Sequence, residues 1–116
     1  MNLYHCMIDL KNDAKVMVFA KALEDWLEHL KTAGQLGSWR LLRRKLNLAS
    51  DAHRDFLLEV EVESLSDLDE LFHYVCRPDD EIAALYDKVH KMIERVAYGL
   101  YREFPDPQRV ERAALL

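Results

Sequence analysis

Residues that could carry acid–base chemistry recur at alternate positions in strand-like segments of this 116-residue chain. His5 lies in one such segment and Glu59 in another, so adjacent strands would bring the imidazole within hydrogen-bond reach of the carboxylate. A histidine that a carboxylate holds in one tautomer can act as a general base. A nearby guanidinium or phenol would stabilise negative charge that develops on a substrate. The predicted catalytic residues are His5, Glu59, Arg43 and Tyr101.

The predicted ligand pocket around this group has apolar and acidic walls, formed by Met7, Asp9, Trp39, Leu57 and Glu61. Apolar walls exclude water and shift the pKa values of the groups that they enclose. The same residues fit a second interpretation, in which Arg43, Glu59 and His5 form a satisfied polar network inside a protein interface. Structural ion-pair networks perturb titration as catalytic sites do, so the pattern leaves both interpretations open.

The elements that must position these residues begin with a strand at Leu3–Leu10, where side-chain character alternates. A helix follows, because apolar residues recur at helical spacing over Val16–Leu30. Asn12 or Asp13 is the expected N-cap, since a short side-chain oxygen can accept from the free amides of the first turn. Gly34 is the expected end of this helix, because glycine enters the left-handed conformation without steric cost.

Two further strands are predicted at Ser38–Leu48 and Phe56–Val62, joined by a hairpin loop at residues 49–54. One register places apolar residues opposite apolar residues and opposite charges together, which is the arrangement that cross-strand pairs favour. That register pairs Leu46 with Phe56, Leu42 with Val60 and Arg43 with Glu59.

The second half of the chain reads as a broken helix and a last strand. Ser66 and Asp69 form an S-x-x-D box that predicts a helix start. Pro78 breaks this helix, and the acidic residues after it suit the N-terminus of another helix. A last strand is predicted around residues 96–102, so residues 1–104 form one domain and residues 105–116 a C-terminal tail.

The order of strand, helix, two strands, broken helix and strand predicts an α+β fold of the ferredoxin-like βαββαβ type. Such a fold has an antiparallel four-stranded sheet with its helices on one face. The open face would combine aromatic and aliphatic side chains with charged ones, including Leu3, Leu41, Lys45 and the candidate site residues. An apolar face of this size with compensating charges is typical of an isologous interface, so the sequence predicts a homodimer through the open face.

Four segments also carry a family resemblance: N-L-Y-H-x-x-I-D-L-K at the start, W-R-L-L-R-R-K-L-N-L, F-x-x-E-V-E-V-x-S-L and the closing Y-G-L-Y-R-E-F. The chain resembles a family of small uncharacterised bacterial proteins, with marine metagenomic members, in the dimeric α/β-barrel superfamily. The resemblance implies a homodimer whose two sheets pack face to face. It implies no particular activity, because the superfamily includes cofactor-independent monooxygenases, isomerases, haem-degrading enzymes and proteins without a known role.

Three functions follow as hypotheses. The first is a small-molecule site between the two sheets, acting as a cofactor-independent monooxygenase or isomerase on an aromatic or enolic compound, with His5 as base and Glu59 as its orienting partner. The second is a non-enzymatic binding module that uses the same pocket. The third is a structural or interaction dimer whose polar interface is sealed.

Other partners are not expected. The net charge of −5 and the acidic residues Glu59 and Glu61 on a central strand argue against nucleic acid. Glu70 and His73 have the E-x-x-H spacing of di-iron bundles, but matching carboxylates are not evident, so no metal or cofactor is predicted. The chain shows neither a signal peptide nor a membrane span, which predicts a cytoplasmic protein with two buried, reduced cysteines, Cys6 and Cys76.

Overall fold

The computed structural model describes residues 1–51, 53–107 and 110, and its helices and strands follow the predicted order. They are β1 Asn2–Leu10, α1 Val16–Thr32, β2 Ser38–Arg43, β3 Phe56–Val62, α2 Leu65–Val75, α3 Asp80–His90 and β4 Ile93–Arg102. The helix break at Pro78 separates α2 from α3, as predicted. β4 begins before the predicted start, because Ile93 already pairs with Leu10 of β1.

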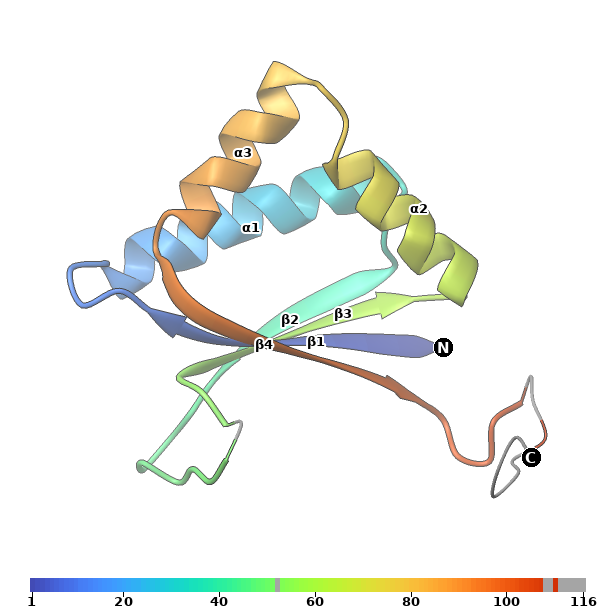
Figure 1. Ribbon diagram of the computed structural model, residues 1–116, viewed down its shortest axis with the longest axis horizontal. Helices are drawn as coiled ribbons and strands as arrows, with labels where there is room; N and C mark the ends of the chain where they lie inside the picture. Colours follow the sequence, from blue (N-terminus) through green and yellow to red (C-terminus); the bar gives the residue numbers. More distant parts are fainter. Residues whose placement is uncertain (52, 108–109, 111–116) are drawn as a thin grey trace.

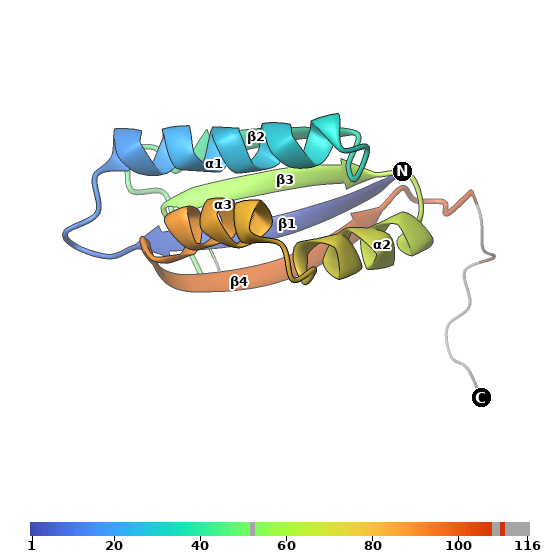
Figure 2. The ribbon, with the colours of Figure 1, turned by 90° about the horizontal axis from the view of Figure 1, so that it is seen from above.

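The four strands form one sheet in the order β2-β3-β1-β4, and every neighbouring pair is antiparallel. All three helices lie on one face of this sheet (Figure 1). Figure 2 shows that α3 and α2 follow one another along the sheet, beside α1. The structure therefore confirms the predicted ferredoxin-like α+β fold.

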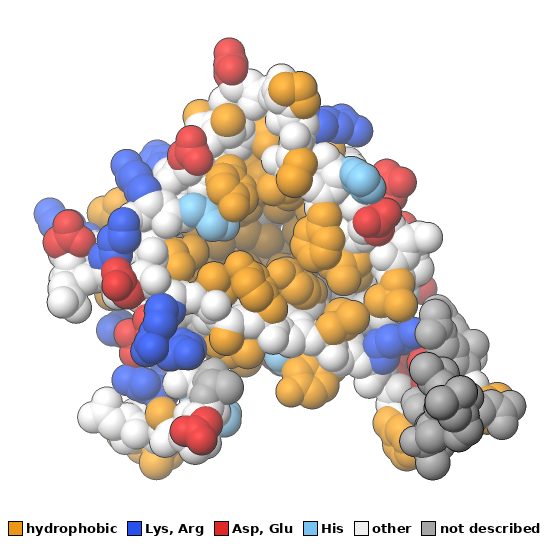
Figure 3. All heavy atoms as spheres, viewed as in Figure 1, with side chains coloured by type: hydrophobic (Ala, Val, Ile, Leu, Met, Phe, Trp, Pro, Cys, Tyr) orange, Lys and Arg blue, Asp and Glu red, His pale blue; other side chains and the backbone are white. Residues whose placement is uncertain are grey.

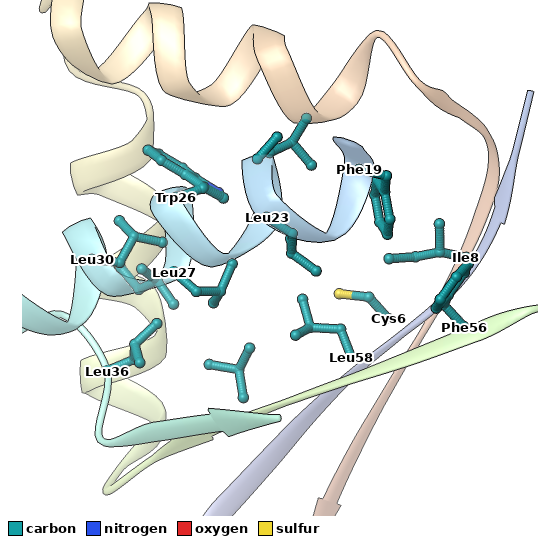
Figure 4. Packing of buried hydrophobic residues seen from close by; sticks show 14 of the residues in the cluster. Cys6, Ile8, Phe19, Leu23, Trp26, Leu27, Leu30, Leu36, Phe56 and Leu58 are labelled. Carbon is teal, nitrogen blue, oxygen red and sulfur yellow. The ribbon is translucent and has the colours of Figure 1, made fainter. Parts of the chain in front are cut away.

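The hydrophobic core lies between the sheet and the helices. Phe19 of α1 is fully buried, and Ile8, Phe56 and Leu58 contribute from the central strands (Figure 4). α1 buries one stripe of side chains at helical spacing, which is what anchors it to the sheet. We refer to this side of the sheet as the helix face and to the other side as the open face.

The ends of the helices partly match the prediction. Gly34 has a φ of 75°, and its amide bonds to the carbonyl of Lys31, so it ends α1 as expected. The predicted N-caps are wrong. α1 begins after Lys15 without a side-chain cap, and α2 is capped by the reciprocal pair Ser64 and Asp67.

The pairing of β2 with β3 differs from the predicted register by three residues. Phe56 pairs with Arg43 rather than Leu46, and Glu59 pairs with Arg40 rather than Arg43. β2 ends at Arg43, and Leu46 has a φ of 57° in the loop that follows. Both registers place apolar residues together and an arginine opposite Glu59, so cross-strand pairing could not choose between them.

An odd offset turns every β2 side chain to the opposite face of the sheet. Trp39 and Leu41 consequently pack toward the core instead of lining the open face. Leu42 and Arg40 take the open-face positions. The predicted strand residues Lys45 and Leu46 lie beyond the end of β2.

Candidate functional site

The open face carries His5 and Glu59 opposite one another on β1 and β3. His5 Nε2 lies 3.5 Å from Glu59 Oε1, and the two side chains are only 16% and 13% exposed although no helix covers them. Arg40 donates from Nε to the other oxygen of Glu59. Arg43, the predicted partner of Glu59, instead lies over the ring of Phe56, with its guanidinium carbon 5.5 Å from the ring centre.

Tyr101 joins the same group from β4. Its ring centre lies 5.0 Å from that of His5. The residue opposite His5 is Gly99, and a side chain there would begin 3.6 Å from the Tyr101 ring. A Cβ atom at position 99 would therefore make ordinary van der Waals contact with the phenol ring and with His5.

Asp9 serves a different cluster, at the end of the sheet. One of its oxygens accepts from the amide of Asp55 at 3.1 Å, and the other lies 3.3 Å from Arg54 and 3.5 Å from Arg95. Burial alone raises the pKa of the Asp9 carboxyl, but this amide and the two guanidinium groups together hold its pKa below the ordinary value. Asp9 thus ties the loop before β3 and the start of β4 to β1.

The remaining predicted pocket residues divide between the two faces. Met7 pairs with Leu57 on the open face, and Glu61 accepts a 2.9 Å hydrogen bond from the Ser38 hydroxyl there. Trp39 borders a hollow of this face, but its indole lies on the other side of the sheet. Its indole packs against the core and donates from Nε1 to Glu28 of α1 at 3.0 Å.

The open face holds a shallow hollow of about 270 Å³ at its β2 side, lined by Met1, Leu3, Ser38, Trp39, Arg40, Glu59 and Glu61. Its polar groups already pair with one another through the contacts of Glu59 with Arg40 and of Glu61 with Ser38. This hollow is therefore a charged surface depression beside the predicted His5 group.

A larger cavity lies on the helix face, between the sheet and all three helices. Its volume is about 380 Å³, and Figure 3 shows it as a hollow ringed by hydrophobic side chains. Ile8, Leu58 and Val60 contribute from the sheet, and Trp26 and Leu27 from α1. Among the described lining residues there is no Asp, Glu, Lys or Arg.

The break between α2 and α3 leaves this cavity accessible. Pro78 has no amide proton to continue α2. Asp79 then caps α3 by accepting from the amides of Glu81 and Ile82 at 2.9 and 3.1 Å. Because the cap starts α3 as a separate helix, neither helix covers the whole β1–β4 side of the sheet (Figure 2).

Aromatic side chains gather at the cavity. The rings of Tyr4 and Tyr98 stack with centres 5.9 Å apart, and Phe72 meets Tyr4 edge-on at 5.6 Å. Tyr86 stacks on His90 with ring centres 3.6 Å apart. All of these residues line the cavity, so a bound molecule would meet ring faces and phenol hydroxyls.

The phenols of Tyr4 and Tyr98 and the buried thiol of Cys6 stay protonated at neutral pH. Burial, with the neighbouring Cys6 and Tyr98, raises the pKa of Tyr4, and burial likewise raises the pKa of Tyr98. Burial also raises the pKa of the Cys6 thiol to about 11, although its hydrogen bond with Tyr4 acts in the opposite direction. Tyr4 and Tyr98 are thus neutral hydrogen-bond donors.

His90 is held in one orientation at the end of α3. Its Nδ1 lies 2.8 Å from the backbone carbonyl oxygen of Tyr86. A carbonyl can only accept, so Nδ1 carries the proton in the neutral ring and Nε2 keeps its lone pair.

The described residues support neither a metal site nor a membrane-spanning helix. No group of three or more His, Cys, Asp or Glu side chains there could hold a metal ion, and His73 pairs with Asp69 at 3.4 Å. No helix there has the length and apolar character needed to cross a membrane. The prediction that both cysteines are buried is wrong for Cys76, which is exposed at the rim of the cavity.

An antiparallel βαββαβ sheet with helices on one face and an open second face defines the ferredoxin-like α+β class. Within that class, the chain belongs to a family of unknown function, DUF6614, whose model matches residues 1–116. The predicted resemblance to a family of uncharacterised proteins is thereby confirmed. Comparison with curated proteins finds no match.

Solved structures share the fold at low sequence identity. A protein from Agrobacterium tumefaciens is 17% identical, with a TM-score of 0.68 over 92% of this chain and 98% of its own. A dimeric ferredoxin-like protein of unknown function from Bacteroides fragilis is 14% identical, with a TM-score of 0.57 over 88% and 95%. The hydroxynitrile lyase of Passiflora edulis is 10% identical, with a TM-score of 0.61 over 86% and 90%.

Sequence reasoning missed the helix-face cavity and therefore His90, Tyr86 and Tyr98 as site residues. Two features of the sequence could have indicated this cavity. Tyr4 and Tyr98 are large polar-tipped residues at positions predicted to face the core, and a buried phenol usually needs a partner. Pro78 also predicted that the second helix would not run unbroken over the sheet.

Proposed function

We propose that the chain forms a homodimer through the open face, and that each protomer binds a small, uncharged, mainly apolar molecule in the helix-face cavity. The observation that carries the ligand proposal is the cavity itself. Its volume of about 380 Å³ is in the range of ligand pockets. Because no charged residue is found among its described lining residues, an ionic ligand would lose its hydration without gaining a counter-charge.

The open face supports the dimer. Leu42 and Tyr101 are 40% and 62% exposed there, beside the half-buried Leu3, Met7 and Leu57. A continuous surface of this kind is typical of an interface. The Bacteroides fragilis protein, which has the same fold, is dimeric. Glu59 at the centre of the face pairs with Arg40 within one protomer, so its charge would enter an interface already compensated.

A second candidate places the ligand between the two sheets, as the sequence predicted. Two observations favour it: the hollow of about 270 Å³ beside Glu59, and His5 Nε2, which is buried without a hydrogen bond among the described residues. In this version His5 would be the base, Glu59 its orienting partner and Tyr101 the donor to developing negative charge. Arg40 would replace Arg43 in the predicted set. The activity would be that of a cofactor-independent monooxygenase or isomerase.

The two candidates separate in a fluorescence titration. Trp26 lines the helix-face cavity, so in a Trp39→Phe background its emission reports binding there. We expect the neutral ketones 2-tetralone, 2-indanone or phenylacetone to quench Trp26 saturably, and the similarly sized anion 2-naphthoate to bind at least tenfold more weakly. Val96→Phe fills the cavity, and it should weaken ketone binding at least tenfold.

Val18→Phe is the matched control, because Val18 is exposed on α1 and does not line the cavity. This variant should bind the ketones as the parent protein does. If none of the three ketones binds, or if Val96→Phe binds as tightly as Val18→Phe, the cavity is not the ligand site. Binding that is instead lost in His5→Gln would favour the site between the sheets.

A further inference from the structure

One titratable side chain of the helix-face cavity has no role in ligand binding as proposed above. Among the described lining residues, His90 is the only imidazole, and it lies at the end of α3 beside the cavity. It stacks on Tyr86, and its Nδ1 donates to the Tyr86 carbonyl at 2.8 Å. In the neutral ring Nδ1 carries the proton that is donated to the backbone, so Nε2 of His90 is the nitrogen with a lone pair that can accept a proton.

The other polar groups of the cavity complement a base. Tyr4 and Tyr98 carry phenol hydroxyls that remain protonated, and both line the same cavity as His90. A protonated phenol beside apolar walls can donate a hydrogen bond to an oxygen that is gaining negative charge, and Tyr98 would do so from the mouth of the cavity, where it is 60% exposed. The cavity therefore combines an imidazole nitrogen, phenol donors and apolar walls.

We propose that this cavity catalyses proton transfer at carbon, with His90 Nε2 as the general base and the Tyr98 hydroxyl as donor to the substrate oxygen. The inference rests on the proposed function, because the substrate is the ligand of the helix-face cavity. The substrate class is a neutral ketone that carries an aromatic ring and has an acidic C–H next to the carbonyl.

The step balances without an oxidant or a reductant. Nε2 takes the proton, the C–H electron pair becomes the C=C bond of an enolate, and the carbonyl π pair moves onto oxygen, where the phenol stabilises it. The imidazolium then exchanges its Nε2 proton with solvent and returns a proton to carbon, which restores the neutral ring. Return to the same carbon exchanges hydrogen with solvent, and return to a conjugated carbon gives an isomer.

The test measures solvent deuterium uptake next to the carbonyl of 2-tetralone, 2-indanone and phenylacetone by NMR, with binding followed in parallel through Trp26. We expect the protein to accelerate exchange above the buffer rate for a ketone that binds. His90→Gln removes the basic nitrogen at similar size and should reduce the acceleration about 100-fold or more while ketone affinity stays within a few-fold. Tyr98→Phe should reduce the acceleration of exchange by about tenfold or more.

His73→Gln is the matched control, because His73 is exposed on α2 and does not line the cavity. Binding without accelerated exchange would overturn this inference and leave the proposed function standing. Exchange that survives in His90→Gln would overturn the role of His90. Failure of all three ketones to bind would contradict the proposed function, and the inference with it.

Discussion

The two faces of the sheet differ in the side chains that the same strands place on them. Along β3, Phe56, Leu58 and Val60 are buried on the helix face, and the intervening Glu59 and Glu61 lie on the open face. The helix face has too little side-chain volume to fill the space below α2 and α3, which leaves the cavity. The open face is instead tied across its strands by the ion pair of Arg40 with Glu59 and by the contact of His5 with Glu59. A single alternating strand thus presents an apolar cavity on one face of the sheet and a charged, half-buried surface on the other.

This difference has an energetic side. Apolar burial is the main stabilising contribution to folding, and the helix face supplies it. Partly exposed ion pairs such as that of Arg40 with Glu59 contribute little to stability. In the proposed interface they would instead determine which charged groups of the second protomer can lie opposite them. Changes on the helix face should therefore alter folding and ligand binding, whereas changes on the open face should alter assembly.

Truncation of the core is the largest expected effect. Phe19→Ala removes a fully buried ring and should lower the free energy of unfolding by about 3–5 kcal/mol. Tyr101→Ala removes an aromatic ring that is 62% exposed, and it should cost less than about 1 kcal/mol in the protomer. Urea unfolding at protein concentrations low enough to give monomers measures both. If both variants lost the same unfolding free energy, the helix face would not be the main source of stability, and this account would be contradicted.

A charge in the middle of the open face should break the dimer. Leu57→Arg would place an unpaired charge inside the proposed interface, so we expect the dimer dissociation constant to rise about 100-fold or more, which corresponds to about 2.7 kcal/mol. Sedimentation equilibrium measures the change. Met17 of α1 is 79% exposed, and Met17→Arg should leave the dimer intact. If the dimer dissociated in Met17→Arg but not in Leu57→Arg, the interface would lie on the helices.

The two cysteines should differ in reactivity. Cys6 lies in the core with a pKa raised to about 11 by burial, whereas Cys76 is exposed at the rim of the cavity. Because the thiolate is the reactive form, iodoacetamide should label Cys76 at least about tenfold faster than Cys6 at pH 8. Peptide mass spectrometry resolves the two sites. Equal rates would show that the floor of the cavity is open to solvent.

The smallest effect concerns pH and the Asp9 cluster. Since the folded-state pKa of Asp9 lies below its unfolded value, its ionised form stabilises the protein at neutral pH, and this stabilisation disappears as the pH falls through the folded-state pKa. Asp9→Asn should therefore cost about 1 kcal/mol at pH 7. The difference from the parent protein should shrink below about pH 4. Thermal unfolding at several pH values measures it, and a difference independent of pH would mean that the ion pairs contribute nothing.

Much of the fold could be predicted from local signals. The strict alternation of Phe56–Val62, the helical stripe of α1 and the turn at Gly34 each depend on residues that are close in the sequence. The pairing of His5 with Glu59 followed from β1 and β3 being central neighbours. Long, regular periodicity is the most dependable signal of secondary structure.

The site could be predicted only in part. The β2 register depends on where the hairpin turns, and the exposed loop residue Leu46 has an apolar side chain that favoured the wrong register. Arg43 and Trp39 were therefore assigned to the wrong face. The cavity depends on how far α2 and α3 leave the sheet uncovered, which is a property of helix packing and not of any local pattern.

The most direct test of the different roles of the two faces is one NMR titration. Backbone amide spectra recorded as 2-tetralone is added would report both faces at once. We predict that the largest shifts occur at Leu27, Val89 and Val96 around the helix-face cavity, with little change at Arg40 and Glu61. Shifts confined to Arg40 and Glu61, with Leu27 and Val89 unchanged, would contradict the account and place the ligand between the sheets.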